Sequence, residues 1–163
     1  MARPKSVTIK SLNAFFSKNF GDLTAELNNG TVVKMSDYLG SPIVVVNVAS
    51  KWGATDREYK QLQQLLDQFS NLKVLAFPSN QFGNQEPGTD AQILEFAKGY
   101  GFTGDLFKKT DVNGADEHEV FKWLKAQPKG SGFLTNKIKL GFSRQTRFIM
   151  KNNISTRNEI RDK

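Results

Sequence analysis

The sequence predicts an α/β protein built on a central sheet with parallel strands. Residues 43–48 form an apolar, β-branched run of the kind that is buried on both faces of a covered sheet. Residues 56–69 carry apolar side chains at helical spacing, and residues 73–77 form a second apolar run. The order strand, helix, strand implies a right-handed crossover between parallel strands. We therefore expect a mixed sheet flanked by helices.

The junction between the first strand and its helix is the natural place for chemistry. In α/β proteins the end of a central strand and the amides of a helix N-terminus converge there. Here the junction presents Trp52. Thr55 and Glu58 fit a capping box, in which Thr55 would be the N-cap of the helix. The residues expected on its apolar face are Tyr59, Leu62, Leu65, Leu66 and Phe69.

Before the first strand, the pattern predicts an N-terminal β-hairpin. Residues 23–27 and 31–35 are strand-like runs on either side of Asn28-Asn29-Gly30, and an Asn-Gly turn is a strong hairpin signal. A short helical turn over residues 36–40 follows and ends at a glycine.

After the second strand, the chain predicts a long loop and two further helices. Residues 78–89 are polar, and loops of this length are uncommon and often functional. Asp90 is expected to cap a helix that runs to about Lys98, and another helix spans roughly 116–126. Residues 148–150 form a last strand, beyond which the pattern fades.

Composition excludes several kinds of site. The chain has 163 residues, 38% of them hydrophobic, which fits one domain with a core of its own. It contains no cysteine, so disulfides, zinc–thiolate sites and thiol nucleophiles are excluded. His118 is the single histidine, and a histidine-rich metal site is excluded with it. We expect no cofactor, no metal and no transmembrane segment.

Positive charge is concentrated at both ends of the chain. Residues 1–21 carry four basic residues and no acidic one, and residues 137–163 carry eight basic and two acidic residues. The intervening part has fourteen acidic and eleven basic residues. Such ends favour an anionic partner such as RNA, an acidic protein surface or lipid, and a merely solubilising role explains them equally well. The speculative partner-binding residues are Arg3, Lys5, Lys10, Arg144, Arg147, Arg157 and Arg161.

These patterns divide the chain into three parts. Residues 1–21 form a basic extension, residues 22–151 the folded domain, and residues 152–163 a basic, polar tail. The extension has features of an organellar transit segment, being basic and serine-containing, and it serves equally as a docking arm. The expected location is therefore mitochondrial or cytoplasmic.

Several motifs together resemble the glutathione peroxidase family, whose fold is thioredoxin-like. The motifs are Val46-Asn47-Val48-Ala49-Ser50-Lys51, Leu75-Ala76-Phe77-Pro78, Asn80-Gln81-Phe82-Gly83, Gln85-Glu86-Pro87-Gly88, Val112-Asn113-Gly114 with His118, and Gln127-Pro128-Lys129-Gly130. The resemblance covers roughly residues 22–150. The short link between Asn113 and Ile138 is similar to the phospholipid-hydroperoxide branch, which implies a monomeric fold. Relative to the family, the C-terminus is shortened after the last strand.

The resemblance implies a catalytic tetrad that this sequence has largely lost. The family reduces hydroperoxides with a cysteine or selenocysteine at the N-terminus of the first crossover helix, where the helix dipole favours the thiolate. That position falls on Trp52, and the family glutamine falls on Gln85. The family Trp-Asn pair falls on Leu140-Gly141, and two further family cysteines fall on Ser79 and about Lys98.

Three functional hypotheses follow. The first is a family member that has lost peroxidase activity, with Trp52 filling the vacated pocket or offering an aromatic platform. It would be a binding or structural subunit of a large protein or ribonucleoprotein complex. The second is a glutathione- or thioredoxin-dependent peroxidase of the oxidative-stress response, whose native residue 52 is cysteine or a selenocysteine misread as tryptophan. Glutathione would bind only then, with Lys51 and Lys129 attracting it. The third, a nucleic-acid-binding module, rests on charge alone.

Overall fold

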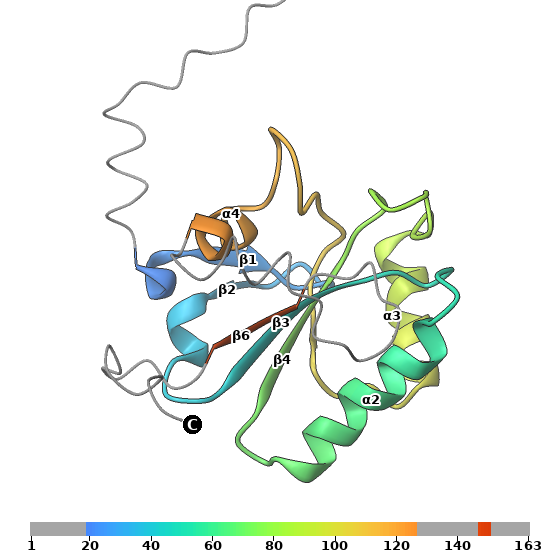
Figure 1. The fold of residues 1–163 in the computed structure, drawn as a ribbon, viewed down its shortest axis with the longest axis horizontal. Coiled ribbons are helices and arrows are strands. Elements are labelled where there is room, and N and C mark those ends of the chain that lie inside the picture. The colour runs from blue at the N-terminus through green and yellow to red at the C-terminus, as the bar shows by residue number, and fades with distance from the viewer. Residues whose placement is uncertain (1–18, 127–146, 151–163) are drawn as a thin grey trace, which may run out of the picture.

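A four-stranded mixed sheet lies at the centre of the protein (Figure 1). The structure is a computed structural model that describes residues 19–126 and the backbone of residues 147–150. The strand order is β5-β4-β3-β6, with β3 at Ile43–Val48, β4 at Lys73–Pro78, β5 at Asp105–Leu106 and β6 at Arg147–Met150. β3, β4 and β5 are parallel, while β6 pairs with β3 antiparallel. The predicted parallel crossover and the last strand are confirmed, and the two-residue β5 was not predicted.

The predicted hairpin forms beside the sheet. β1 (Thr24–Glu26) pairs antiparallel with β2 (Val32–Lys34), and Gly30 in the turn has a φ of 88° that a side chain would disfavour. Short 3-10 helices flank it: η1 at Phe20–Asp22 and η2 at Met35–Tyr38. The Leu27–Phe107 bridge holds the hairpin near the end of β5.

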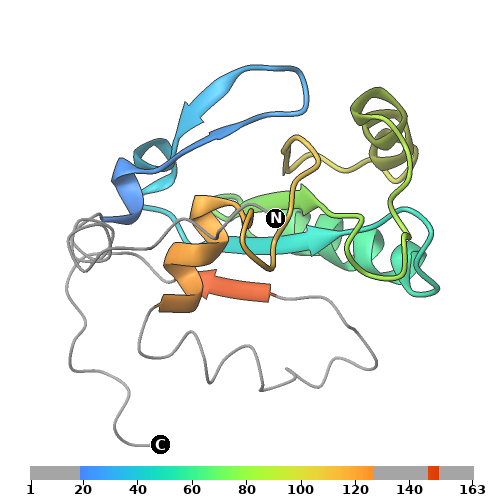
Figure 2. The same cartoon turned by 90° about the horizontal axis from the view of Figure 1, so that it is seen from above.

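The strands of the sheet send alternate side chains to two separate apolar clusters. One cluster joins Val45, Leu75 and Phe77 to the hairpin and to α4 (Glu119–Ala126). The other joins Val44, Val46 and Ala76 to α2 (Thr55–Gln68) and α3 (Asp90–Gly99). Figures 1 and 2 show the same division, with α2 and α3 on one side of the sheet and α4 on the other. Both faces are covered, which explains why all six residues of β3 are buried.

The predicted capping box of α2 does not form. The helix begins at Thr55 itself, its N-cap position is Ala54, and no side chain caps it. The Thr55 hydroxyl instead donates a 2.6 Å hydrogen bond to the carbonyl of Ala49 at the end of β3. The contact to the strand therefore replaces the local cap, and Glu58 is buried with 1% exposure rather than reaching back in solvent.

The predicted apolar face of α2 is only partly buried. Tyr59 and Leu62 are buried and Leu66 packs against the same cluster, as expected. Leu65 and Phe69 are 37% and 47% exposed, so their predicted inward orientation is wrong. Both follow Leu62, the last fully buried residue of α2, and Phe69 is the C-cap that follows the end of the helix.

The other two helices begin at different residues than predicted. Thr89, not Asp90, is the N-cap of α3, where its hydroxyl accepts from the Gln92 amide and the Gln92 side chain accepts from the Thr89 amide. α4 begins at Glu119, three residues after the predicted start. Its predicted inward residues Val120, Phe121 and Leu124 are buried.

Several sequence-based predictions fall outside the described residues. The basic extension at 1–21, apart from Asn19, Phe20 and Gly21, and the tail at 152–163 lie there, so the proposed domain limits stay predictions. None of the described helices has the length and apolarity that a membrane crossing requires.

Candidate functional site

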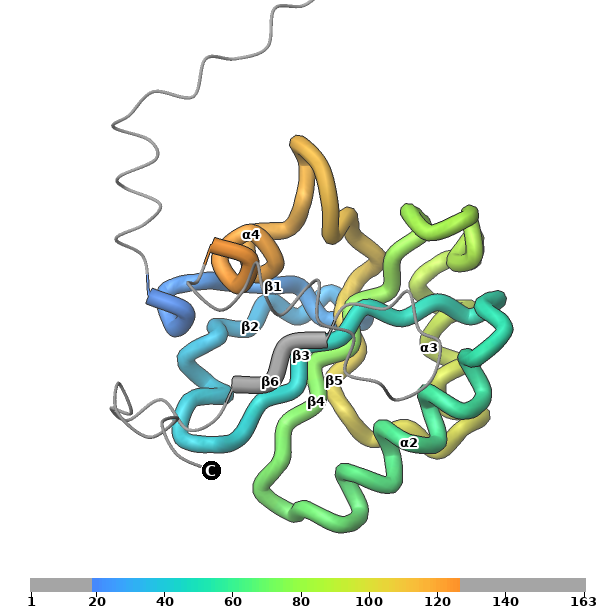
Figure 3. The backbone as a smooth tube through the Cα atoms, in the orientation of Figure 1, coloured from blue at the N-terminus to red at the C-terminus, as the bar shows by residue number. Residues whose placement is uncertain are grey.

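Two loops meet at the carboxyl ends of β3 and β4. The loop of residues 49–54 leads from β3 into α2, and the loop of residues 79–89 leads from β4 to α3 (Figure 3). The Lys51 amide donates a 2.9 Å hydrogen bond to the Gln85 carbonyl, which ties one loop to the other. Trp52 is half-buried in the first loop, and its carbonyl accepts from the Thr55 amide at 3.0 Å.

The loop of residues 79–89 has no helix or strand, yet hydrogen bonds fix it along its length. The Ser79 amide donates to the Val48 carbonyl, continuing the β3–β4 pairing by one residue. Asn80 Oδ1 accepts from the Glu86 amide at 2.9 Å, which closes the loop on itself. The Lys109 ammonium donates to the carbonyls of Glu86 and Gly88, at 3.3 Å and 2.7 Å. The predicted long loop is therefore confirmed, and it is a fixed structure.

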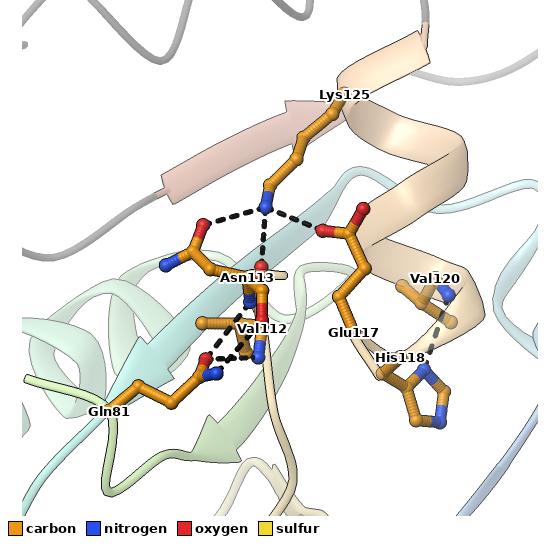
Figure 4. Close-up of polar contacts among 7 residues, drawn as sticks. All are labelled: Gln81, Val112, Asn113, Glu117, His118, Val120 and Lys125. Atoms are coloured by element: carbon orange, nitrogen blue, oxygen red, sulfur yellow. Dashed lines mark hydrogen bonds and ion pairs between the residues drawn. The ribbon is translucent and has the colours of Figure 1, made fainter. Parts of the chain in front are cut away.

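A polar cluster joins this loop to the segment before α4 (Figure 4). Gln81 Oε1 accepts from the amides of Val112 and Asn113, at 2.8 Å and 2.9 Å, while its Nε2 donates to the Asn113 carbonyl. The Lys125 ammonium donates to the Val112 carbonyl, to Asn113 Oδ1 and to the Glu117 carboxylate. The Lys125 and Glu117 side chains are 22% and 17% exposed, so this ion pair is largely shielded from solvent.

His118 occupies the residue before α4 and caps that helix. Its Nδ1 accepts from the Val120 amide at 3.2 Å (Figure 4). Its carbonyl accepts from the Lys122 amide. The ring packs against Phe77, with centroids 5.5 Å apart. Burial lowers the pKa of His118, and the nearby Glu119 carboxylate partly opposes that shift. These contacts give His118 a structural role at the start of α4.

Behind the two loops, a cavity of about 330 Å³ has both polar and apolar walls. It is lined by Ser50, Lys51, Glu86, Pro87, Gly88, Gln92, Ile93 and Phe96. Glu86 is fully buried, and the side chain and backbone of Ser50 interact with its carboxylate. The Ser50 hydroxyl is buried beside it. Burial raises the pKa of Glu86. Hydrogen bonds from Ser50 and the positive charge of Lys109 oppose this shift.

The buried polar groups were not singled out from the sequence. Ser50, Tyr59 and Glu86 come from three different segments, and the Gln-Glu-Pro motif drew attention to Gln85 rather than to its neighbour. The Tyr59 hydroxyl is also buried, and it has no hydrogen-bond partner among the described residues. Burial raises the pKa of Tyr59, and the proximity of Glu86 raises it further.

Two of the predicted site residues lie on loops that the structure brings together. The side chains of the other predicted site residues are not described. Trp52 and Gln85, both half-buried, lie on the loops tied by the Lys51–Gln85 hydrogen bond. Leu140 and Gly141 lie outside the described residues, as do Arg3, Lys5, Lys10, Arg144, Arg157 and Arg161. Arg147 begins β6, where only the backbone is described.

The described site holds hydrogen-bonding groups and no thiol. The Trp52 indole offers a single N–H donor and no nucleophilic atom. Gln85 offers an amide that binds and polarises but does not react. Among the described residues there is no group of three or more histidine, aspartate or glutamate side chains placed to hold a metal ion. The arrangement is equipped for binding.

Comparison with known proteins agrees with the arrangement of strands and loops. The sequence model described as glutathione peroxidase matches residues 20–125. The phospholipid hydroperoxide glutathione peroxidase of Bos taurus is 45% identical over 139 residues, which cover 84% of this chain and 69% of the relative. That of Mus musculus is 42% identical over the same length.

Solved structures show the same fold. The crystal structure of Trgpx in apo form aligns with a TM-score of 0.50 at 32% identity, covering 69% of this chain and 67% of that one. The crystal structure of T. cruzi GPX1 aligns with a TM-score of 0.56 at 23% identity, covering 83% of this chain and 80% of that one. The fold is an α/β fold of the thioredoxin-like class, as predicted. The chain belongs to the glutathione peroxidase family.

Proposed function

We propose that this family member does not reduce hydroperoxides and serves as a binding or structural subunit of a larger assembly. The observation that carries the proposal is Trp52. It lies on the loop between β3 and α2, where the family resemblance puts the nucleophile, and the chain contains no cysteine. Leu140 and Gly141, at the positions of the family Trp-Asn pair, support the same conclusion.

The chemistry of the reaction makes the loss of a thiol decisive. A thiolate or selenolate attacks the peroxide O–O bond, takes one oxygen and releases an alcohol or water. A thiol of the reductant then displaces the oxygen as water and forms a mixed disulfide or its selenium equivalent, and a further thiol cleaves that bond to regenerate the nucleophile. An indole ring cannot take part in either step. Gln85 can hydrogen-bond to a bound molecule but cannot replace the missing atom.

A second candidate function is the family's own peroxidase activity, with cysteine or selenocysteine as the native residue 52. The tie between the two loops favours it, because the Lys51–Gln85 hydrogen bond keeps residue 52 near the Gln85 loop. Glutathione or a thioredoxin would then be the reductant. The substitutions at positions 140 and 141 argue against it, since one misread codon would leave them unchanged.

Hydroperoxide turnover separates the two candidates. The purified chain is assayed with hydrogen peroxide and with a phospholipid hydroperoxide, using glutathione and, separately, thioredoxin as reductant. We expect no turnover above the rate of a heat-denatured sample. Turnover that scales with the concentration of the native chain would show that the loss of activity was wrongly inferred.

The partner is sought through the basic ends. The full chain is isolated from the mitochondrion or the cytoplasm of its native cells. The size of the particle that contains it is then measured with and without ribonuclease treatment. We expect the chain in a large protein or ribonucleoprotein complex, and removal of residues 1–18 or 152–163 should release it. A chain that is recovered only as a monomer would contradict the subunit role.

A further inference from the structure

The chain contains two Asn-Gly pairs, Asn29-Gly30 in the turn of the hairpin and Asn113-Gly114 before α4. We propose that Asn113 is a site of spontaneous deamidation, promoted by the Gln81 side chain and by a lysine of α4. The product is an aspartyl or isoaspartyl residue. This modification does not depend on whether hydroperoxide reduction is lost.

The reaction needs only the chain and water. The Gly114 amide nitrogen loses its proton to solvent base and attacks Asn113 Cγ, so that an N–C bond forms. The bond from Cγ to Nδ2 breaks, Nδ2 leaves as ammonia, and a succinimide ring remains. Water then adds to one of the two ring carbonyls and opens the ring to aspartate or isoaspartate. Neither step transfers electrons to or from another molecule, so no oxidant or reductant is required.

The first support is the state of the Gly114 nitrogen, which is the nucleophile. Within residues 19–126 its N–H donates to no carbonyl, whereas the Gly30 N–H donates to the Leu27 carbonyl at 2.8 Å. Asn113 and Gly114 are both exposed, so solvent base can reach this N–H. Gly114 has a φ of 90°, and no described atom lies within 4 Å of where a Cβ would stand. The ring therefore has room to form.

Gln81 acts on the peptide group that contains the nucleophile. Its Nε2 donates at 2.8 Å to the Asn113 carbonyl, which is bonded directly to the Gly114 nitrogen (Figure 4). When that nitrogen loses its proton, negative charge is shared with the carbonyl oxygen, and a donor already aimed at the oxygen stabilises it. The contact therefore favours the reactive form of the nucleophile.

The third support is the charge beside the group that is attacked. The Lys125 ammonium donates to Asn113 Oδ1 at 2.8 Å (Figure 4). Attack at Cγ places negative charge on this oxygen, and a cation already in contact with it stabilises that charge without rearrangement. The equivalent oxygen of Asn29 accepts from the uncharged Thr31 amide. The two Asn-Gly pairs therefore differ at both the nucleophile and the attacked carbonyl.

The product alters the cluster that holds the long loop. A new carboxylate would lie beside the Lys125 ammonium, and an isoaspartyl link adds one carbon to the main chain after Val112. The contacts of Gln81 and Lys125 with this segment cannot all survive that lengthening. Deamidation should therefore loosen the attachment of residues 79–89 to the segment before α4 as the protein ages.

The experiment compares the two Asn-Gly pairs within one molecule. The purified full chain is incubated at physiological temperature and pH, and samples are digested with trypsin, which separates residues 19–34 from residues 110–122. Mass spectrometry with fragmentation measures the conversion of amide to acid at each asparagine. We expect Asn113 to react about tenfold faster than Asn29 in the folded chain. In urea, where both lose their contacts, the two rates should be similar.

Variants test the two groups that promote the reaction. Lys125→Met should slow it about tenfold, less than the factor of about 100 that one such donor contributes in a water-excluded active site. Gln81→Glu keeps an oxygen for the Val112 and Asn113 amides but loses the donor to the carbonyl, and should slow it about threefold. The matched control is Lys98→Met, which removes an exposed lysine of α3 and should leave the rate unchanged.

A loosened fold speeds deamidation, so a slower rate in these variants cannot arise from lost stability. Two results would overturn the proposal: a rate at Asn113 no greater than that at Asn29 in the folded chain, or an unchanged or faster rate in Lys125→Met. If Lys125→Met does not fold, an unchanged or faster rate in Gln81→Glu has the same meaning. Hydroperoxide turnover enters none of these measurements, so the proposed loss of peroxidase activity is tested separately.

Discussion

The Lys51 amide donates a 2.9 Å hydrogen bond to the Gln85 carbonyl, and this contact joins the two loops at which the family carries out its chemistry. It uses backbone atoms on both sides, so it does not depend on which side chain occupies position 52. The platform is therefore retained while the reactive atom is absent. The retained strands and loops can be tested by substitution.

A cysteine placed at position 52 should be acidic but a poor catalyst. The position precedes the N-terminus of α2, whose dipole stabilises a thiolate, so Trp52→Cys should give a thiol pKa below the ordinary value of about 8.5. Because the chain has no other cysteine, the pH dependence of alkylation by iodoacetamide reports this thiol alone. Ser70→Cys, beyond the C-terminus of the same helix, is the control and should show no lowering.

The same variant tests how far one substitution restores the peroxidase. Catalytic groups that act as a unit lose most of their effect when any one is missing. With Leu140 and Gly141 unchanged, we expect Trp52→Cys to have less than about one hundredth of the turnover of a cysteine-containing relative assayed in parallel. Turnover close to that of the relative would show that positions 140 and 141 matter little.

Lys125 should be a major contributor to stability. Its ammonium holds the Val112 carbonyl, Asn113 Oδ1 and Glu117 together, and the ion pair is largely shielded. Lys125→Met leaves the Glu117 carboxylate without its partner, which should cost about 2–4 kcal/mol of unfolding free energy in urea. Lys60→Met is the control: the Lys60–Asp56 pair is exposed, and its loss should leave the free energy of unfolding almost unchanged.

Glu86 should make the protein less stable as the pH rises. Burial raises its pKa in the folded state above the ordinary 4.5, although Ser50 and Lys109 oppose the shift. The folded state then holds the proton more tightly than the unfolded one, so stability is full below pH 4.5 and falls as the pH rises through the folded pKa. Tyr59, whose pKa is raised by burial and by Glu86, stays neutral throughout this range.

Glu86→Gln isolates this contribution. Its unfolding free energy, measured in urea from pH 4 to pH 8, should not show the loss seen in the wild type. The difference between the two proteins should be smallest at pH 4 and favour the variant as the pH rises. Glu95→Gln serves as the exposed control and should follow the wild-type curve. A wild-type curve parallel to that of Glu86→Gln would contradict the prediction.

His118 should act in the opposite direction, because its contribution to stability is lost as the pH falls. Burial lowers its folded pKa below 6.5, so its contribution is full above pH 6.5 and is lost as the pH falls through the folded pKa. Protonation also removes the lone pair with which Nδ1 accepts from the Val120 amide. As the only histidine, its ring protons give one NMR titration, whose midpoint should lie below 6.5.

The matched variants separate the cap from the charge. His118→Asn keeps an oxygen acceptor for the start of α4 and should abolish this pH dependence with little loss at pH 8. His118→Ala removes the acceptor and should cost about 1 kcal/mol at pH 8. Equal stabilities of the two variants at pH 8 would show that the Nδ1 contact does not stabilise the helix.

The sequence predicted the strands well because their signal is local. β3 begins and ends where its β-branched run does, and β4 extends only one residue beyond its predicted end. The helix starts were less predictable, since contacts to other elements decide them. Thr55 donates to Ala49 rather than capping α2, and His118 supplies a cap that no simple motif announces.

The candidate site was predictable only in part, for the same reason. The family motifs located Trp52 and Gln85, whose loops the structure brings together. The cavity depends on Ser50 and Glu86 being buried next to each other, a property of the folded chain that no residue pattern contains. Leu65 and Phe69 show the converse, because their helical spacing predicted burial that the end of α2 does not provide.

The antiparallel partner of β3 comes from the far end of the chain. Val46 pairs with Arg147, about 100 residues later, whereas β4 follows β3 after a single helix. A chain emerging from the ribosome can pair β3, β4 and β5 first, and one edge of β3 stays open until β6 has been made. That interval is when a nascent copy is most exposed to pairing with another chain, so slow translation or truncation before residue 147 should increase aggregation.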